Sequence, residues 1–205
     1  MTAVALRSAL TLADVLAGTG GALASRAAGE IAFTSVSIDS RTLEPGALFV
    51  AVRGARFDGH DFLAEAAGRG ALAALVHRDA PAPAGLPLVR VADTTRGLSD
   101  LARRVRRAAG VPVVGVTGSI GKTTTKDMTA HLLSTRGPVL KTEGNLNNQY
   151  GLPLTLLRLA PEHTAAVVEL GMSAPGEIRA LAALAEPDVA TITRIAPVHL
   201  EFFPS

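Results

Sequence analysis

The sequence of 205 residues contains no cysteine and no tryptophan, and aromatic residues make up only 3% of it. The absence of cysteine excludes disulfides and cysteine-ligated zinc, and it fits a reducing compartment. With so few aromatic side chains, the core must be built from Ala, Leu and Val. The hydrophobic fraction of 48% is nevertheless large enough for a substantial core, and the composition does not favour disorder.

The sequence also has little excess of positive over negative charge, since the formal net charge is only +2. So small a value does not predict a nucleic-acid partner. The one dense basic run is RRVRR at 103–107, which we interpret as a solvated helix end; a patch that binds anions or nucleic acid is the alternative. Only three lysines occur, Lys122, Lys126 and Lys141, so a lysine inside a glycine-rich segment is less easily explained as incidental. No window holds 18 uncharged apolar residues, and we expect no membrane-spanning segment.

The first part of the chain, residues 1–107, is predicted to form one small α/β unit. At its N-terminus Leu6, Leu10, Ala13 and Leu16 recur at helical spacing and predict an amphipathic helix. The remaining expected elements are a short strand in 36–41, a strand over 47–52, a helix over 59–69, a strand or helix end over 71–77, a strand over 88–93 and a helix over 94–109.

From residue 111 the pattern changes, after a boundary marked by Gly110 and Pro112. The run VPVVGVT is apolar and β-branched throughout, which is typical of a strand buried on both faces of a parallel sheet. Strands then alternate with helices, so we predict a second α/β domain over 111–205 with a mostly parallel sheet. Because the pattern gives few strands and no terminal helix, we expect this domain to be incomplete at its C-terminus. The expected elements are strands over 111–117, 138–142, 164–170 and 188–193, and helices over 122–135, 153–159 and 175–184.

The segment GVTGSIGKTTTKDM at 115–128 has the character of a phosphate-binding loop. The common pattern G-x-x-x-x-G-K-[ST] requires glycine where Val116 stands. A buried strand nevertheless leads into small residues and then into a helix that begins at Lys122, which supplies converging N–H groups and a helix dipole. Lys122 can reach the β- and γ-phosphates, and the Thr123 hydroxyl can ligate Mg²⁺. A glycine-rich turn without a ligand is the alternative.

Three further features follow strand ends, where ligands bind in open α/β sheets. Glu169 ends an apolar strand and can hold a metal beside the loop, or it is simply a surface acid. His199 follows the next strand and is a candidate from its position alone, although a lone histidine is more often structural. The segment GNLNNQYGLP at 144–153 is either a plain loop or a set of amides that orient a carboxyl or phosphate group. In the first unit a turn or a helix cap fully explains DSR at 39–41 and RFDGHDF at 56–62.

Together these segments resemble a known family. The blocks DSRTLEPGALFVAVRGARFDGHDF, VVGVTGSIGKTTTKDM, GNLNNQYGLPLTLL, VVELGMSAPGEI and APVHLE occur in the order found in the ATP-dependent Mur ligases of bacterial cell-wall synthesis. The family's loop, T-G-S/T-x-G-K-T, matches residues 117–123 and does not need the first P-loop glycine. The resemblance implies a UDP-sugar-peptide-binding domain at 1–107, a central ATP-binding domain at 111–205, and a third domain that is missing here.

The resemblance also implies roles for individual residues. The catalytic set is Lys122, Glu169, His199 and Asn145. The metal set is Thr123, Glu169 and His199. ATP binding is implied for Thr117, Gly118, Ser119, Ile120, Gly121, Lys122, Thr123 and Thr124, and substrate binding for Ser40, Arg41, Asn147 and Asn148.

The implied reaction is amide formation with ATP and Mg²⁺. ATP phosphorylates the terminal carboxylate of UDP-N-acetylmuramoyl-tripeptide, and the amino group of D-alanyl-D-alanine attacks the acyl phosphate. We expect a cytoplasmic monomer with no nucleic-acid partner and no membrane insertion. The alternatives are the ligase that adds the third peptide residue, a folylpolyglutamate synthase, or a nucleotide-binding module without ligase activity. We expect residues 1–205 alone to bind nucleotide weakly and not to form the amide.

Overall fold

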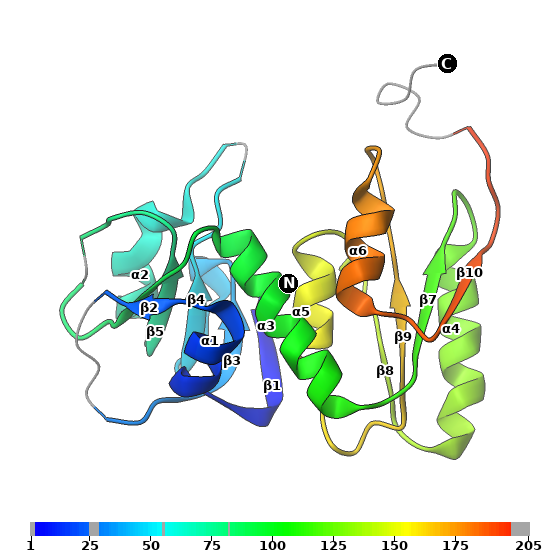
Figure 1. Cartoon of the computed structure of the whole chain (residues 1–205), viewed down its shortest axis with the longest axis horizontal. Coiled ribbons are helices and arrows are strands. Elements are labelled where there is room, and N and C mark those ends of the chain that lie inside the picture. Colours follow the sequence, from blue (N-terminus) through cyan, green and yellow to red (C-terminus); the bar gives the residue numbers. More distant parts are fainter. Residues whose placement is uncertain (1–2, 25–28, 55, 82, 198–205) are drawn as a thin grey trace. The chain divides into compact units, whose positions relative to one another are not determined.

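The computed structural model describes residues 3–24, 29–54, 56–81 and 83–197 (Figure 1). The chain divides into two compact units, Met1–Arg104 and Val105–Ser205, and each has its own sheet. The division falls within helix α3 (Thr94–Ala109), whose bounds are those predicted from the sequence. Both sheets are mostly parallel and carry helices, so the predicted α/β class is confirmed.

The sheet of the first unit has the strand order β1-β3-β4-β5-β6-β2. The four central strands are parallel, whereas the edge strands β1 and β2 are antiparallel to their neighbours. The strands are β1 (Ala3–Thr11), β2 (Ala22–Leu23), β3 (Ala32–Ser37), β4 (Ala47–Val50), β5 (Ala73–Val76) and β6 (Leu88–Arg90). The helices are α1 (Leu12–Thr19), α2 (Leu63–Gly68) and the first part of α3, with short 3-10 turns η1 (Ser40–Thr42) and η2 (Gly59–Phe62).

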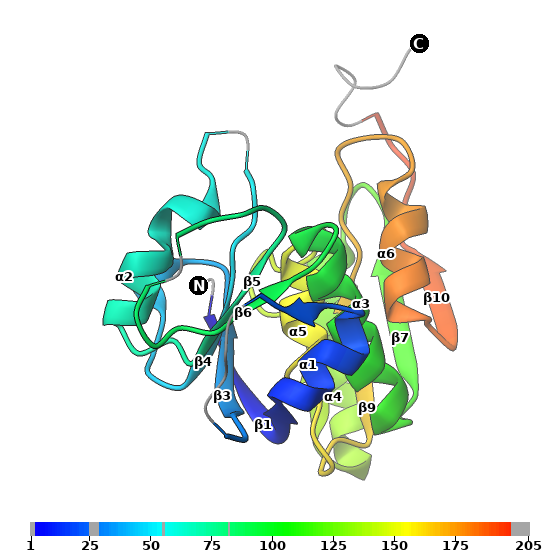
Figure 2. The ribbon, with the colours of Figure 1, turned by 60° about the vertical axis from the view of Figure 1, so that its left-hand side comes forward.

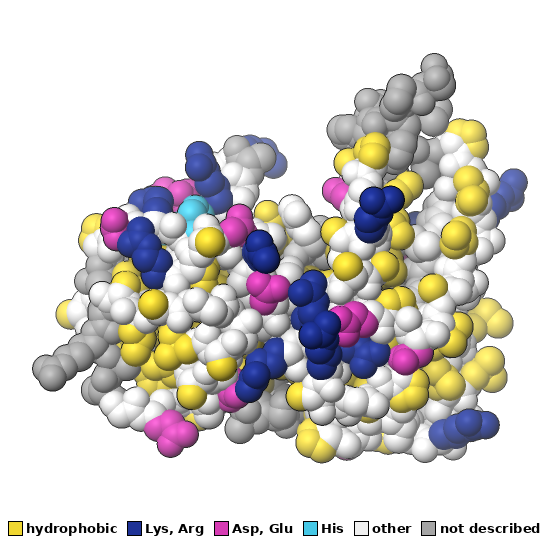
Figure 3. Space-filling view, in the orientation of Figure 1, with side chains coloured by type: hydrophobic (Ala, Val, Ile, Leu, Met, Phe, Trp, Pro, Cys, Tyr) yellow, Lys and Arg dark blue, Asp and Glu magenta, His cyan; other side chains and the backbone are white. Residues whose placement is uncertain are grey.

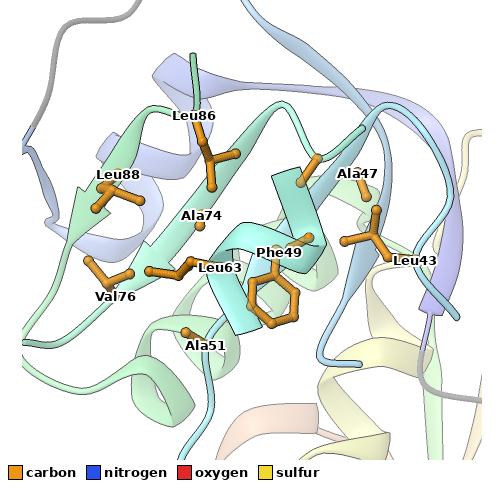
Figure 4. Packing of buried hydrophobic residues seen from close by; sticks show 11 residues of the cluster. Leu43, Ala47, Phe49, Ala51, Leu63, Ala74, Val76, Leu86 and Leu88 are labelled. Atoms are coloured by element: carbon orange, nitrogen blue, oxygen red, sulfur yellow. The ribbon is translucent and has the colours of Figure 1, made fainter. Parts of the chain in front are cut away.

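Both faces of this sheet are buried. Phe49 of β4 and Val76 of β5 pack with Leu63 of α2 on one face (Figure 4). Leu75 points to the other face, where Gly97 of α3 approaches it so closely that an added Cβ would lie 2.9 Å from its Cδ2. In Figure 2, α2 lies on one side of the sheet and α1 and α3 on the other. Burial on both faces is why these strands are continuous apolar runs in the sequence.

The predicted N-terminal helix is wrong for its first half. Residues Ala3–Thr11 form β1, which pairs antiparallel with β3 and has an irregularity between Ala5 and Leu10. The helix begins only at Leu12 because Thr11 and Asp14 form a capping box: Thr11 Oγ1 accepts from the N–H of Asp14, and the Asp14 carboxylate accepts from the N–H of Thr11. Pairing with β3 therefore overrides the helical spacing of the apolar residues.

The second unit is built on a parallel sheet of order β10-β7-β9-β8. Helix α4 covers one face, where Ala130 packs on Val116 and Val167, and α5 and α6 lie on the other face (Figure 1). Since all strands run the same way, their carboxyl ends share one edge. The elements are β7 (Val113–Thr117), α4 (Lys122–Leu133), η3 (Ser134–Arg136), β8 (Val139–Lys141), α5 (Gly151–Leu156), β9 (Ala165–Glu169), α6 (Glu177–Ala185) and β10 (Val189–Ile192).

The basic run RRVRR is not a solvated helix end throughout. Arg106 is only 8% exposed, donates to the carbonyls of Ala185 (3.0 Å) and Glu186 (2.8 Å), and pairs with Asp188. Arg107 forms an ion pair with the Glu186 carboxylate. On the face drawn in Figure 3, acidic side chains lie among the basic ones. The run therefore anchors the end of α6 instead of forming a free cationic patch.

Within the described ranges, no helix has both the length and the apolar character that crossing a membrane requires.

Candidate functional site

The predicted phosphate loop, residues 117–123, joins β7 to the start of α4. Gly118 and Gly121 both have positive φ angles, 133° and 85°, which favour glycine. At Gly118 a Cβ would also overlap Thr193 Oγ1. Val116, the mismatch with the common P-loop pattern, lies inside β7 and is buried against α4. The loop thus begins after this position and has no need of glycine there.

The segment that follows β10 holds this loop in place, which the sequence did not reveal. The N–H of Ser119 donates to the carbonyl of Arg194 over 2.7 Å, and its hydroxyl exchanges hydrogen bonds with the main chain of Ala196 at 2.9 and 3.0 Å. Thr193 Oγ1 donates to the carbonyl of Ile120 over 2.6 Å. Three residues of this segment, Thr193, Arg194 and Ala196, therefore brace the loop through Ser119 and Ile120.

Glu169 lies beside the loop at the carboxyl end of β9 and is only 3% exposed. Its Oε2 accepts from Thr123 Oγ1 over 3.0 Å, and its Oε1 accepts from Asn147 Nδ2 over 2.9 Å. No lysine or arginine among the described residues forms an ion pair with it. A buried carboxylate whose hydrogen-bond donors are all neutral lacks a compensating positive charge, and burial penalises such an unpaired charge.

A bound divalent cation would supply the positive charge that the Glu169 carboxylate lacks. The Glu169 carboxylate and the Thr123 hydroxyl are hard oxygen ligands of the kind that Mg²⁺ binds. The described part of the chain holds no cluster of three or more His, Cys, Asp or Glu residues that could form an all-protein cage. Mg²⁺ is commonly held by one or two carboxylates together with substrate phosphates, and these two residues suit that mode.

Lys122 folds back over the loop, where its Nζ donates to the carbonyls of Gly118 (2.7 Å) and Ser119 (3.4 Å). Its side chain also borders a pocket of about 480 Å³. The other lining residues come from the asparagine-rich loop, from the segment after β9 and from α6: Asn147, Asn148, Gln149, Gly171, Met172, Ser173, Glu177, Ala180 and Leu181. The predicted residues Lys122, Asn147 and Asn148 thus meet in one pocket, and Asn147 links it to Glu169. Thr124, by contrast, is exposed on α4.

The three asparagines of the loop differ in their surroundings. Asn147 bonds to Glu169, as described above. Asn148 Oδ1 accepts from the N–H groups of Tyr150 (3.1 Å) and Gly151 (2.9 Å), at the start of α5. Asn145 is exposed, and its carbonyl accepts from the N–H of Asn147 over 2.8 Å. The geometry therefore brings Asn147, and not Asn145, against the buried carboxylate.

The two candidates in the first unit each contact an acid. Ser40 is buried, and its hydroxyl donates to Glu65 Oε2 over 3.0 Å. Arg41 is exposed and forms a two-pronged pair with Asp39, at 2.9 and 2.7 Å. The remaining candidate, His199, lies outside the described residues.

Two family models match this chain. The model described as the Mur ligase family, catalytic domain, matches residues 32–106, and the Mur ligase middle domain matches residues 116–205. The chain belongs to the Mur ligase family. The middle-domain match contains the phosphate loop and Glu169, and the other match contains Ser40 and Arg41.

Two relatives of this chain from different bacteria carry the same name. The UDP-N-acetylmuramoyl-tripeptide–D-alanyl-D-alanine ligase of Escherichia coli is 47% identical over 176 residues, which is 86% of this chain and 38% of the relative. The ligase of that name from Bacillus subtilis is 42% identical, over 95% of this chain and 42% of the relative. The chain thus spans about two fifths of the length of these curated relatives.

Solved structures of the family agree with this fold. A MurF crystal structure from Acinetobacter baumannii matches with a TM-score of 0.89 and 38% identity, over 98% of this chain and 44% of that one. A MurF ligase from Thermotoga maritima, solved in complex with ADP, matches with a TM-score of 0.74 and 41% identity. The match covers 82% of this chain and 39% of that one.

Proposed function

We propose that this protein is an ATP-dependent amide ligase that adds D-alanyl-D-alanine to UDP-N-acetylmuramoyl-tripeptide. The observation that carries the proposal is the buried Glu169 carboxylate, held by Thr123 and Asn147 beside a phosphate loop. Two findings on relatives support it: they bear the name of this activity, and one was solved with ADP. Since the reaction consumes ATP, we propose that it takes place in the cytoplasm. We also propose that the protein is a monomer.

The chain's own residues would act chiefly by positioning and by charge neutralisation, which are the main demands of phosphoryl transfer. The N–H groups at the start of α4 and the Lys122 ammonium would hold the phosphates of ATP. Thr123 and Glu169 would hold Mg²⁺, which when bound neutralises charge on the transferring phosphoryl group. Asn147 would keep the Glu169 carboxylate turned toward the loop. We further propose His199 and Asn145 as members of this site, on the family resemblance alone.

In the reaction itself, an oxygen of the tripeptide carboxylate attacks the γ-phosphorus of ATP. The bond from that phosphorus to the bridging oxygen breaks, and ADP leaves. The amine of D-alanyl-D-alanine then attacks the acyl carbon, and the tetrahedral intermediate loses phosphate and a proton to give the amide. Two anions, carboxylate and nucleotide, must approach one another, so the Lys122 ammonium and the N–H groups of the loop would supply electrostatic stabilisation.

The two parts of the chain would divide the substrates. We propose that residues 1–107 bind the UDP-sugar peptide, with Ser40 and Arg41 on the nucleotide side, and that residues 111–205 bind ATP. The pairing of Arg41 with Asp39 leaves the arginine side chain exposed, so its guanidinium is accessible to an anionic ligand.

The decisive experiment measures the product formed by the protein expressed from its complete reading frame. We expect UDP-N-acetylmuramoyl-pentapeptide, ADP and phosphate from the tripeptide, D-alanyl-D-alanine and ATP. The Lys122→Ala variant should lose this activity, and the Arg107→Ala variant, changed at an exposed ion pair, should keep it. Turnover with diaminopimelate or lysine on the dipeptide substrate, and none with D-alanyl-D-alanine, would identify a different member of the family. ADP binding without any amide product would identify a nucleotide-binding module.

A further inference from the structure

Lys126 is a buried cation in the turn of α4 that follows the phosphate loop, and the proposed function gives it no role. Its side chain is 4% exposed, and Nζ donates to the carbonyl of Thr142 over 2.9 Å. Nζ also lies 3.3 Å from Asp127 Oδ1, which in turn pairs with Lys141. Lysine is almost never buried so fully without a specific partner. Lys126 follows Thr123 by three positions, so the two side chains leave the same face of the helix.

The partner of Lys126, Thr142, is the residue at which the chain leaves β8. Its N–H still continues the parallel ladder by donating to the carbonyl of Val167 over 3.2 Å. In a regular ladder the next bond would join the N–H of Glu169 to the carbonyl of Thr142. That N–H instead donates to Thr142 Oγ1, over 2.9 Å, and the carbonyl accepts from Lys126. A side-chain hydroxyl thus replaces the main chain as the partner that holds Glu169.

We propose that Thr142 and Lys126 are positioning residues for the carboxylate of Glu169, an inference that rests on the proposed metal site. Lys126 turns the Thr142 carbonyl out of the ladder, and the Thr142 hydroxyl fixes the main chain of Glu169. The redirected chain then runs into the asparagine-rich loop, which brings Asn147 to the carboxylate. Glu169 is consequently held from α4, from the end of β8 and from the loop after it.

The test compares Thr142→Val, which keeps the shape but removes the hydroxyl, with Thr142→Ser, which keeps the hydroxyl. The affinity for ADP is measured by titration calorimetry with and without Mg²⁺, on the protein from its complete reading frame. We expect Thr142→Val to reduce the Mg²⁺-dependent gain in affinity by about 10-fold, the scale found when partners of metal ligands are lost, and to leave metal-free ADP binding unchanged. Thr142→Ser should retain the gain, and Lys126→Met should lose it in part.

Three results would overturn this role. Thr142→Val could retain the full gain, it could lose ADP affinity equally with and without Mg²⁺, or Thr142→Ser could fail to retain the gain. If Thr142→Val does not fold, Lys126→Met decides the question by the same measurement, the ratio of ADP affinities with and without Mg²⁺. An unmodified protein whose ADP affinity does not respond to Mg²⁺ would refute the metal site itself, and the positioning role with it. Failure of the proposed function is thus seen in the unmodified protein, and failure of the inference alone is seen only in the variants.

Discussion

The Asp58 carboxylate and the buried His60 imidazole are joined by a hydrogen bond of 2.6 Å between Oδ1 and Nδ1. His60 Nε2 accepts from the N–H of His77 over 3.1 Å, so the ring is neutral and carries its proton on Nδ1. Burial lowers the pKa of His60 below its ordinary value of 6.5, although Asp58 acts in the opposite direction. Burial raises the pKa of Asp58, but hydrogen bonds from His60 and the charge of Arg78 outweigh it and lower this pKa to about 2.

A pH dependence of stability follows from the lowered pKa of His60. Below pH 6.5 the unfolded chain binds a proton at this residue more readily than the folded chain does. The free energy of unfolding should therefore be highest above pH 6.5 and fall as the pH is lowered through and below this value. Denaturant titrations between pH 7.5 and about 5 measure the slope. His60→Gln should flatten it, and His131→Gln, at an exposed position, should not; equal slopes in the two variants would contradict the assignment.

Arg106 and its neighbour Arg107 should differ sharply in their contribution to stability. Arg106→Leu removes a hydrogen-bond donor from the buried Ala185 carbonyl and from the half-buried Glu186 carbonyl, so we expect a loss of about 3 kcal/mol in the free energy of unfolding. Arg107→Leu removes an exposed ion pair, which water and salt screen, so this substitution should change the free energy of unfolding far less. Chemical denaturation of both variants makes the comparison, and equal losses would show that Arg106 is not the anchor of α6.

Gly118 should tolerate no side chain. In Gly118→Ala the new methyl group would overlap Thr193 Oγ1 and lie 3.0 Å from the main chain of Arg194, at a φ angle that alanine rarely adopts. We expect ADP binding to be lost and the melting temperature to fall. Gly68→Ala is the control, because that site lies in a helix with open space around it and alanine is favoured there. A Gly118→Ala variant that bound ADP normally would contradict the loop geometry.

Glu169→Gln should separate stability from metal binding. The substitution removes a buried charge whose hydrogen-bond donors, among the residues that the structure describes, are the neutral Thr123 and Asn147, so the Mg²⁺-free protein should become more stable, by about 1 kcal/mol. The same variant should lose the effect of Mg²⁺ on ADP affinity. Thermal melts with and without Mg²⁺ test both statements, and a less stable Mg²⁺-free variant would argue that the carboxylate is already compensated by its neighbours.

Features set by neighbouring residues were the ones that could be predicted from the sequence. The buried strand, the glycine turn and the helix start at Lys122 lie within a short stretch, and the fold has them as predicted. The closeness of Thr123 and Glu169 also followed, since parallel strands bring their carboxyl ends to one edge.

Features that depend on distant partners could not be predicted in this way. Residues 3–11 have helical spacing, but their pairing with β3 makes them a strand. Whether Asn145 or Asn147 faces Glu169 depends on how the loop leaves the sheet, which the Lys126–Thr142 hydrogen bond influences. The burial of Arg106 depends on the end of α6, almost eighty positions away in the chain.

The hydrogen bonds between Ser119 and residues 194 and 196 have a consequence for protein engineering. A chimera that exchanges only residues 117–123 with those of another member of the Mur ligase family would separate this loop from the segment that shapes it. The two stretches are a single transferable part, although about seventy residues of chain lie between them. Grafts that carry both stretches should keep nucleotide affinity, whereas grafts of the loop alone should lose it.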